Sequence, residues 1–255
     1  MRFAPDTAVT ARPVDEPSYV RSYVFTRFGI GVLGVLLPVA LVLLEPALFD
    51  GLPAPRGSLS AYYYSGVREI FVGGLWAIGV FLIVYKFLDF SWESLLSSVA
   101  GVAAVLVAVF PTERPGDGVA LNPFQVKLGE GVVSGIHYAT AGTFIVLLVP
   151  ITLLFALNEG KRADNGSRFS GEFWRGFHSV AAVCILAGAI LAAVAGITGG
   201  PDKGVLYGEW IAVWAFGISW LVKGAELDVL FGRARRPVQA AAAEPAPDAP
   251  GVPQS

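Results

Sequence analysis

Six long apolar runs, separated by short polar or Pro- and Gly-rich segments, dominate the hydropathy pattern of this chain. A helix needs about 20 mostly apolar residues to cross the hydrocarbon core of a bilayer, which is about 30 Å thick. The runs lie approximately at residues 28–48, 69–87, 95–110, 133–157, 177–197 and 206–227. Stretches such as VAAVCILAGAILAAVAG lack the alternation of a transmembrane β-strand. The pattern predicts an all-α, polytopic membrane protein with a bundle of six transmembrane helices.

The two ends of the chain differ from this apolar body. Residues 1–27 mix charged residues with Pro and Thr, which does not fit the short basic start of a cleaved signal peptide, so the first run is predicted to be a retained helix. The last residues, QAAAAEPAPDAPGVPQS, have no apolar side chains of the size that forms a core. We therefore expect three parts: a partly disordered cytoplasmic segment (1–27), a transmembrane domain (28–231) and a disordered Ala/Pro-rich cytoplasmic tail (232–255).

Composition agrees with an integral membrane protein. Hydrophobic residues make up 55% of the chain and charged residues only 15%, and the mean hydropathy is +0.63. These values are too apolar for a soluble chain of this length. The formal net charge of −2 gives no indication of a nucleic-acid partner, so the lipid bilayer is the expected partner and protein partners stay unknown.

The basic residues predict the orientation of the bundle, because Lys and Arg concentrate on the cytoplasmic side of membrane proteins. Of the 18 basic residues, 13 fall on the side of the two termini: Arg2, Arg12, Arg21, Arg27, Lys86, Lys161, Arg162, Arg168, Arg175, Lys223, Arg233, Arg235 and Arg236. The other 5 are Arg56, Arg68, Arg114, Lys127 and Lys203. Both termini are therefore expected in the cytoplasm.

Polar residues gather at the predicted outer ends of the helices, most densely in SLSAYYYSGVREIFVGG. If this stretch is a continuous helix, Ser60, Tyr64 and Arg68 share one face at i, i+4 and i+8. Ionisable groups in a membrane span usually face a partner, a cavity or the interface. The candidate ligand-binding residues are Ser60, Tyr64, Arg68, Glu69, His137 and Glu209.

We expect these residues to form one small pocket that is open to the outside and binds an ion, a small anion or a lipid headgroup. Two alternatives stay open. The same side chains are also typical of an interfacial belt, which would leave a structural or assembly scaffold without a ligand site. A membrane-embedded hydrolase is the second alternative. Charged residues at the inner ends, such as Lys86 and Glu93, are expected to have structural roles.

The sequence gives little support for catalysis. A catalytic zinc ion normally has three protein ligands, whereas this chain has 2 histidines, His137 and His178, which the predicted topology places at opposite membrane faces. We expect no metal and no cofactor, although one histidine with carboxylates at the outer face stays an alternative. No nucleophile elbow or phosphate-binding loop is visible. Catalytic residues are unknown, and whether the protein is an enzyme is undecided.

Three stretches carry a resemblance to known proteins: SLSAYYYSGVREIFVGGLWAIGVFLIVYK, VAVFPTE and AVWAFGISWLVKGAEL. Together they resemble a group of uncharacterised bacterial six-helix membrane proteins, which implies a multi-pass protein of the cell inner membrane with no established activity. A more distant likeness is to the superfamily of alkaline ceramidases and progestin-receptor-like membrane hydrolases. In that superfamily a Ser near a His joins further histidines at zinc. Here Ser60 is present, but Tyr64 stands where that His is expected and no late HxxxH occurs.

Overall fold

A computed structural model of the chain describes residues 16–49, 55–85, 91–159, 170–200 and 202–223. The model is 83% helical, and no strand occurs within those ranges. Its elements, in chain order, are α1 (Glu16–Leu48), η1 (Ser60–Tyr64), α2 (Arg68–Val84), α3 (Trp92–Val109), α4 (Pro123–Leu128), α5 (Glu130–Glu159), α6 (Gly171–Thr198) and α7 (Gly204–Lys223). The prediction of an all-α protein is confirmed.

Within the described residues, five helices are long and apolar enough to cross a membrane: Val24–Leu48 within α1, then α3, most of α5 (Glu130–Asn158), α6 and α7. They fall on five of the six predicted runs, which confirms the expectation of a multi-pass membrane protein in this coarser form. The remaining run, residues 69–87, contains α2, which has 17 residues and is shorter than these five. The expected tail, 232–255, and the first 15 residues lie outside the described part of the chain.

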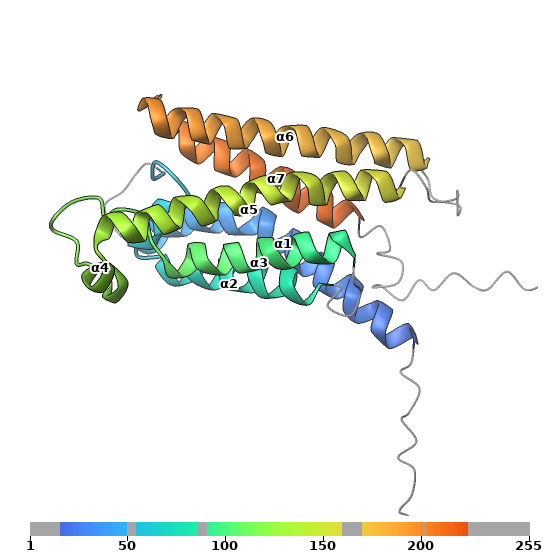
Figure 1. Cartoon of the computed structure of the whole chain (residues 1–255), viewed down its shortest axis with the longest axis horizontal. Coiled ribbons are helices and arrows are strands. Elements are labelled where there is room, and N and C mark those ends of the chain that lie inside the picture. Colours follow the sequence, from blue (N-terminus) through green and yellow to red (C-terminus); the bar gives the residue numbers. More distant parts are fainter. Residues whose placement is uncertain (1–15, 50–54, 86–90, 160–169, 201, 224–255) are drawn as a thin grey trace, which may run out of the picture.

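The six long helices form a closed ring, in which each helix packs against the next. Contacts join α1 to α2, α2 to α3, α3 to α5, α5 to α6, α6 to α7 and α7 back to α1. In Figure 1 these helices lie side by side along the long axis of the molecule, while α4 lies at one end of the bundle, next to the start of α5. Helix α5 also contacts α7, so α6 lies on the outside of the ring, and side chains from the other five helices surround the centre.

Small residues bring neighbouring helices of the ring very close together. A Cβ atom added to Gly188 of α6 would lie 2.5 Å from the carbonyl oxygen of Gly208 in α7. A Cβ atom on Gly79 of α2 would lie 2.7 Å from the carbonyl oxygen of Gly101 in α3. Both contacts are with backbone atoms, which cannot rotate away, so these helix pairs need glycine at the point of contact.

Several boundaries differ from the predicted ones. The first helix begins at Glu16 rather than at residue 28, because its polar first turns extend the helix beyond the apolar run. The segment before α5, expected to be a loop, contains the short helix α4. Asn122 caps this helix by accepting a hydrogen bond from the Gln125 amide, and the Gln125 side chain bonds back to the Asn122 amide. Pro123 at its first position is compatible with such a start.

Candidate functional site

The predicted continuous helix from Ser60 to Arg68 is wrong. Ser60–Tyr64 is the 3-10 helix η1, and α2 begins only at Arg68. The chain turns between them, where the Tyr62 carbonyl accepts hydrogen bonds from both the backbone amide and the hydroxyl of Ser65. The expected i, i+4, i+8 face therefore does not form, and Ser60, Tyr64 and Arg68 reach different partners.

Tyr64 bonds to the loop after α3 and to α4. Its hydroxyl donates to the Thr112 carbonyl at 2.6 Å and accepts from Gln125 Nε2 at 2.8 Å. Gln125 also donates to the same carbonyl at 3.2 Å. Burial raises the pKa of the Tyr64 phenol above its ordinary value of 10.0, although the hydrogen bond from Gln125 opposes the shift. This triangle ties η1 to the segment between α3 and α4 and to α4 itself.

Arg68 lies on the ring of its neighbour Tyr63. The guanidinium carbon is 4.3 Å from the ring centroid, and Nη2 donates to the Tyr63 hydroxyl at 2.7 Å. The same hydroxyl accepts from Asn122 Nδ2 at 3.1 Å, which links it to the cap of α4. Arg68 and Glu69 are both exposed. The Arg68 side chain thus joins the start of α2 to η1 through a cation–π contact and a hydrogen bond.

His137 is buried on α5 and contacts the end of α3. Its Nδ1 lies 2.6 Å from the Phe110 carbonyl oxygen, and its ring packs edge-to-face against Tyr138, with centroids 5.7 Å apart. The side chain is 2% exposed. The carbonyl can only accept a hydrogen bond, so Nδ1 carries the proton in this contact. His137 therefore joins α5 to α3.

Glu209 of α7 holds η1 against the bundle. One carboxylate oxygen accepts a hydrogen bond from the Leu59 amide at 2.6 Å, and the Ser60 backbone also bonds to the carboxylate. Nearby, the Leu206 amide donates to the Gly57 carbonyl at 3.0 Å. Leu59 and Glu209 are 150 residues apart in the sequence, so this link fixes the start of η1 on the first turns of α7.

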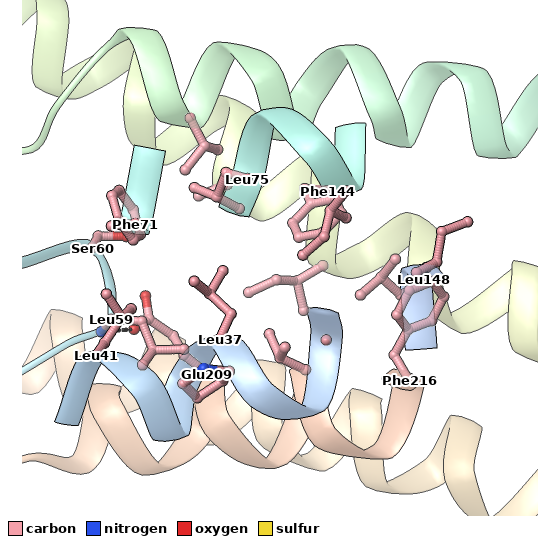
Figure 2. A pocket seen from close by; sticks show the side chains of 18 residues that line it. Leu37, Leu41, Leu59, Ser60, Phe71, Leu75, Phe144, Leu148, Glu209 and Phe216 are labelled. Carbon is pink, nitrogen blue, oxygen red and sulfur yellow. Dashed lines mark hydrogen bonds between the residues drawn. The ribbon is translucent and has the colours of Figure 1, made fainter. Parts of the chain in front are cut away.

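A cavity of about 60 Å³ lies in the middle of the helix ring and opens to its surroundings. Its walls come from α1, α2, α3, α5, α7 and the start of η1, and they are almost entirely apolar. Figure 2 shows Ser60 and Glu209 on one side of the cavity and Phe144, Leu148 and Phe216 on the other. The lining residues are Ile30, Gly34, Leu37, Pro38, Leu41, Leu59, Ser60, Phe71, Leu75, Ile78, Val107, Ala141, Phe144, Ile145, Leu148, Glu209, Val213 and Phe216.

The six sequence-predicted residues thus divide into groups. Ser60 and Glu209 come together at the cavity. Tyr64, Arg68 and His137 bond elsewhere, to Thr112, Tyr63 and Phe110. Glu69 is exposed at the start of α2 and does not line the cavity. The apolar lining residues were missed, because a side chain that faces a central cavity and one that faces a neighbouring helix look alike in an apolar run. Gln125 was also missed, although the spacing Asn-Pro-x-Gln is a helix-start signal.

The end of the bundle opposite η1 and α4 contains a separate buried polar group. His178 Nδ1 lies 2.7 Å from the Ser219 hydroxyl, and the Tyr85 hydroxyl donates to Glu93 at 2.8 Å. Lys223 Nζ lies 4.1 Å from the centroid of the Phe155 ring, which also packs edge-to-face against His178. These contacts join α6 to α7 and the end of α2 to α3, which fits the structural role expected for the inner residues.

Metal ligation has no candidate in the described residues, because no group of three or more His, Cys, Asp or Glu side chains comes together there in a way that could hold an ion. His137 contacts Phe110 at the end of α3, and His178 contacts Ser219 near the end of α7.

Searches of protein families, curated proteins and solved structures find no match to this chain. The arrangement of the site is therefore the basis for a functional assignment. It defines a multi-pass helical membrane protein with an apolar central cavity and one carboxylate at its rim.

Proposed function

We propose that this protein binds a small amphiphilic ligand in the central cavity of a six-helix bundle. In this proposal both termini face the cytoplasm, the membrane is the inner membrane of a bacterium, and the chain belongs with the six-helix bacterial proteins that it resembles. The observation that carries the proposal is the cavity itself, with apolar walls along most of its surface and oxygen atoms of Ser60 and Glu209 on one side.

Several features of α2 support a sixth span. At about 1.5 Å per residue, a helix of this length extends about 25 Å, close to the thickness of the hydrocarbon core. Before it, Tyr63 and Tyr64 contact Asn122 and Gln125 at the end of the bundle where α4 lies. The residue after it, Tyr85, contacts Glu93 in the first turn of α3. Since α3 spans the bundle between these two places, α2 reaches from one end to the other.

The lining of the cavity favours a bound molecule. Small-ligand sites typically have apolar walls with a few polar groups. An empty apolar cavity lowers stability in proportion to its volume, by roughly 24 cal/mol per Å³ in a well-studied series. A ligand with an apolar body would restore those lost contacts, and its polar head would meet the oxygen atoms at the rim.

One observation favours the scaffold alternative for part of the outer cluster. Tyr64, Arg68 and His137 are all bonded to nearby chain segments. These side chains connect η1, α4 and α5 and leave the ligand role to the cavity. The proposal therefore assigns a structural role to them and a binding role to Ser60 and Glu209.

The test compares binding of ten-carbon amphiphiles to purified full-length protein by native mass spectrometry. Ala141 lines the cavity, so Ala141→Phe fills part of it. Val183 of α6 does not line the cavity and is 66% exposed, so Val183→Phe is the matched control. The probes are decylammonium, decanol and decanoate. We expect Ala141→Phe to lower the bound fraction of at least one probe, and Val183→Phe to leave it unchanged. Equal binding in both variants for all three probes would overturn the proposal.

A further inference from the structure

We infer that the cavity selects a cationic amphiphile, whose ammonium head binds Glu209 while its apolar chain occupies the space toward Phe216. This inference rests on the proposed function and names the class of ligand for the same site. Its basis is the position of Glu209. Among the lining residues, which all belong to the described part of the chain, Glu209 is the only charged one.

The carboxylate of Glu209 keeps acceptor capacity for a ligand. A carboxylate has about four lone-pair positions. Leu59 donates to one of its oxygens at 2.6 Å, and the Ser60 backbone supplies a second hydrogen bond. About two positions are then left for a donor that enters the cavity. An ammonium head offers up to three N–H donors together with the opposite charge, and the Ser60 hydroxyl at the same rim is a further acceptor.

The nearby cations of the outer end are bonded elsewhere. Arg56 forms an ion pair with Glu45 at 2.6 Å, and Arg68 lies over the Tyr63 ring. Neither side chain lines the cavity. An anionic head would therefore meet the negative charge of Glu209 with no cationic side chain on the cavity wall to offset the repulsion. A cationic head would neutralise that charge, and partly desolvated pairs of this kind are stronger than exposed ones.

The polar head of the ligand has to provide the selectivity, because its alkyl chain provides little of it. Lipid tails are as apolar as leucine side chains, so moving an alkyl chain from the bilayer into an apolar cavity changes its surroundings only slightly. The charge at the rim is different, since a carboxylate next to an apolar space interacts far more strongly with an opposite charge than it would in water. The ligand is therefore distinguished from ordinary lipid by its head.

The experiment ranks the three ten-carbon probes by native mass spectrometry of the full chain, which requires no variant. We expect decylammonium to bind more tightly than decanol, and decanoate to bind most weakly, with at least about a tenfold difference between the first and the last; tenfold corresponds to about 1.4 kcal/mol. Glu209→Gln, which keeps an acceptor oxygen for the Leu59 amide, should remove this preference. Glu69→Gln, which changes an exposed carboxylate of α2 outside the cavity, is the matched control and should keep it.

The outcomes separate the two proposals. If the probes bind with equal affinity and Ala141→Phe lowers all three, the cavity is a ligand site but the inference about the head is wrong. Tighter binding of decanoate would also overturn it. If decylammonium is preferred equally by the wild type and Glu209→Gln, the preference comes from elsewhere and the inference fails. If no probe depends on the cavity, the proposed function fails and the inference fails with it.

Discussion

Glu45 and Arg56 form a bidentate ion pair at the C-terminal end of α1. Arg56 Nε donates to both carboxylate oxygens, at 2.9 and 3.1 Å, and Nη2 donates to Oε1 at 2.6 Å. Glu45 is 4% exposed, so its charge depends on this partner. The Arg56 amide also donates to the Tyr62 hydroxyl at 3.4 Å. The pair thus fixes the segment before η1 on α1, and η1 in turn forms part of the cavity wall.

Removing Arg56 alone should lower the free energy of unfolding more than removing the charges of both Arg56 and Glu45. Arg56→Met leaves a buried carboxylate without its cation, a change that costs about 3–5 kcal/mol in buried pairs. Adding Glu45→Gln removes the stranded charge, so the double variant should recover part of that loss. Unfolding by a denaturing detergent, followed by circular dichroism, measures both. A double variant less stable than Arg56→Met alone would contradict this account.

Tyr64 predicts a pH dependence in the alkaline range. The pKa of its phenol is raised by burial, so the folded state keeps the proton at a pH where the unfolded chain loses it. Its contribution to stability is fully present below pH about 10, the ordinary value for tyrosine, and is lost as the pH rises further. Tyr64→Phe should therefore flatten the fall in stability above that pH.

Absorbance at the phenolate band checks the same residue directly. The difference between the titration curves of the wild type and Tyr64→Phe isolates one phenol, and we expect its midpoint above 10 in the folded protein. The same difference in denatured protein is the control and should lie near 10. A folded-state midpoint at or below the denatured one would show that burial does not control this phenol.

The elements could be predicted from the sequence to very different degrees. Long apolar runs identify helices such as α5 and α6, because membrane thickness demands their length whatever they contact. The α4 start was visible as a capping box at Asn122. The break between η1 and α2 was marked only by the dipeptide Ser65-Gly66, which is typical of turns. A Cβ added to Gly66 would also meet the Phe49 ring at 2.6 Å, and that contact is tertiary. The hydrogen bond from the Leu59 amide to Glu209 is also a tertiary contact, so no local pattern predicts it.

Helix contacts at glycine give a prediction for α6 and α7. Gly188→Ala places a methyl group 2.5 Å from a backbone oxygen of α7, so the helices must separate. Overpacking of this kind costs about 1–3 kcal/mol. Gly142 of α5 has nothing within 4 Å of an added Cβ, so Gly142→Ala is the control and should be neutral or stabilising by up to about 1 kcal/mol. Unfolding by a denaturing detergent measures the stability of Gly188→Ala and Gly142→Ala. Equal stabilities would contradict a tight α6–α7 contact.

The closed helix ring explains how residues far apart in sequence form one cavity. Helices α1 and α7 contact each other, so the start and the end of the bundle meet. Pro38 of α1, Phe144 of α5 and Phe216 of α7 then line the same space. Apolar pattern alone cannot predict this, because any order of apolar helices satisfies a membrane equally well. The ring order comes from side-chain and glycine contacts between helices, which no local pattern encodes.

The orientation of the whole bundle is open to a labelling test on single-cysteine variants in which Cys184 is replaced by Ser. Gly57 and Lys127 lie toward the end of the bundle that contains η1 and α4. Ser91 and Ser170 are the N-caps of α3 and α6, and both lie at the other end of the bundle. If α2 crosses the membrane and the termini are cytoplasmic, a membrane-impermeant maleimide should label Gly57→Cys and Lys127→Cys in intact bacterial cells. It should label Ser91→Cys and Ser170→Cys only after lysis.

Each alternative gives a different pattern in this test. Gly57 and Ser91 flank α2, so labelling of both from the same side would show that α2 does not cross. Lys127 and Ser170 flank α5, whose apolar stretch Glu130–Asn158 is long enough to span on its own, so this pair is the internal control. The complete reverse pattern would keep six spans but place the termini outside, against the excess of basic residues on their side. In that case Glu209 and the cavity rim would face the cytoplasm, and a ligand would be expected from the inner leaflet.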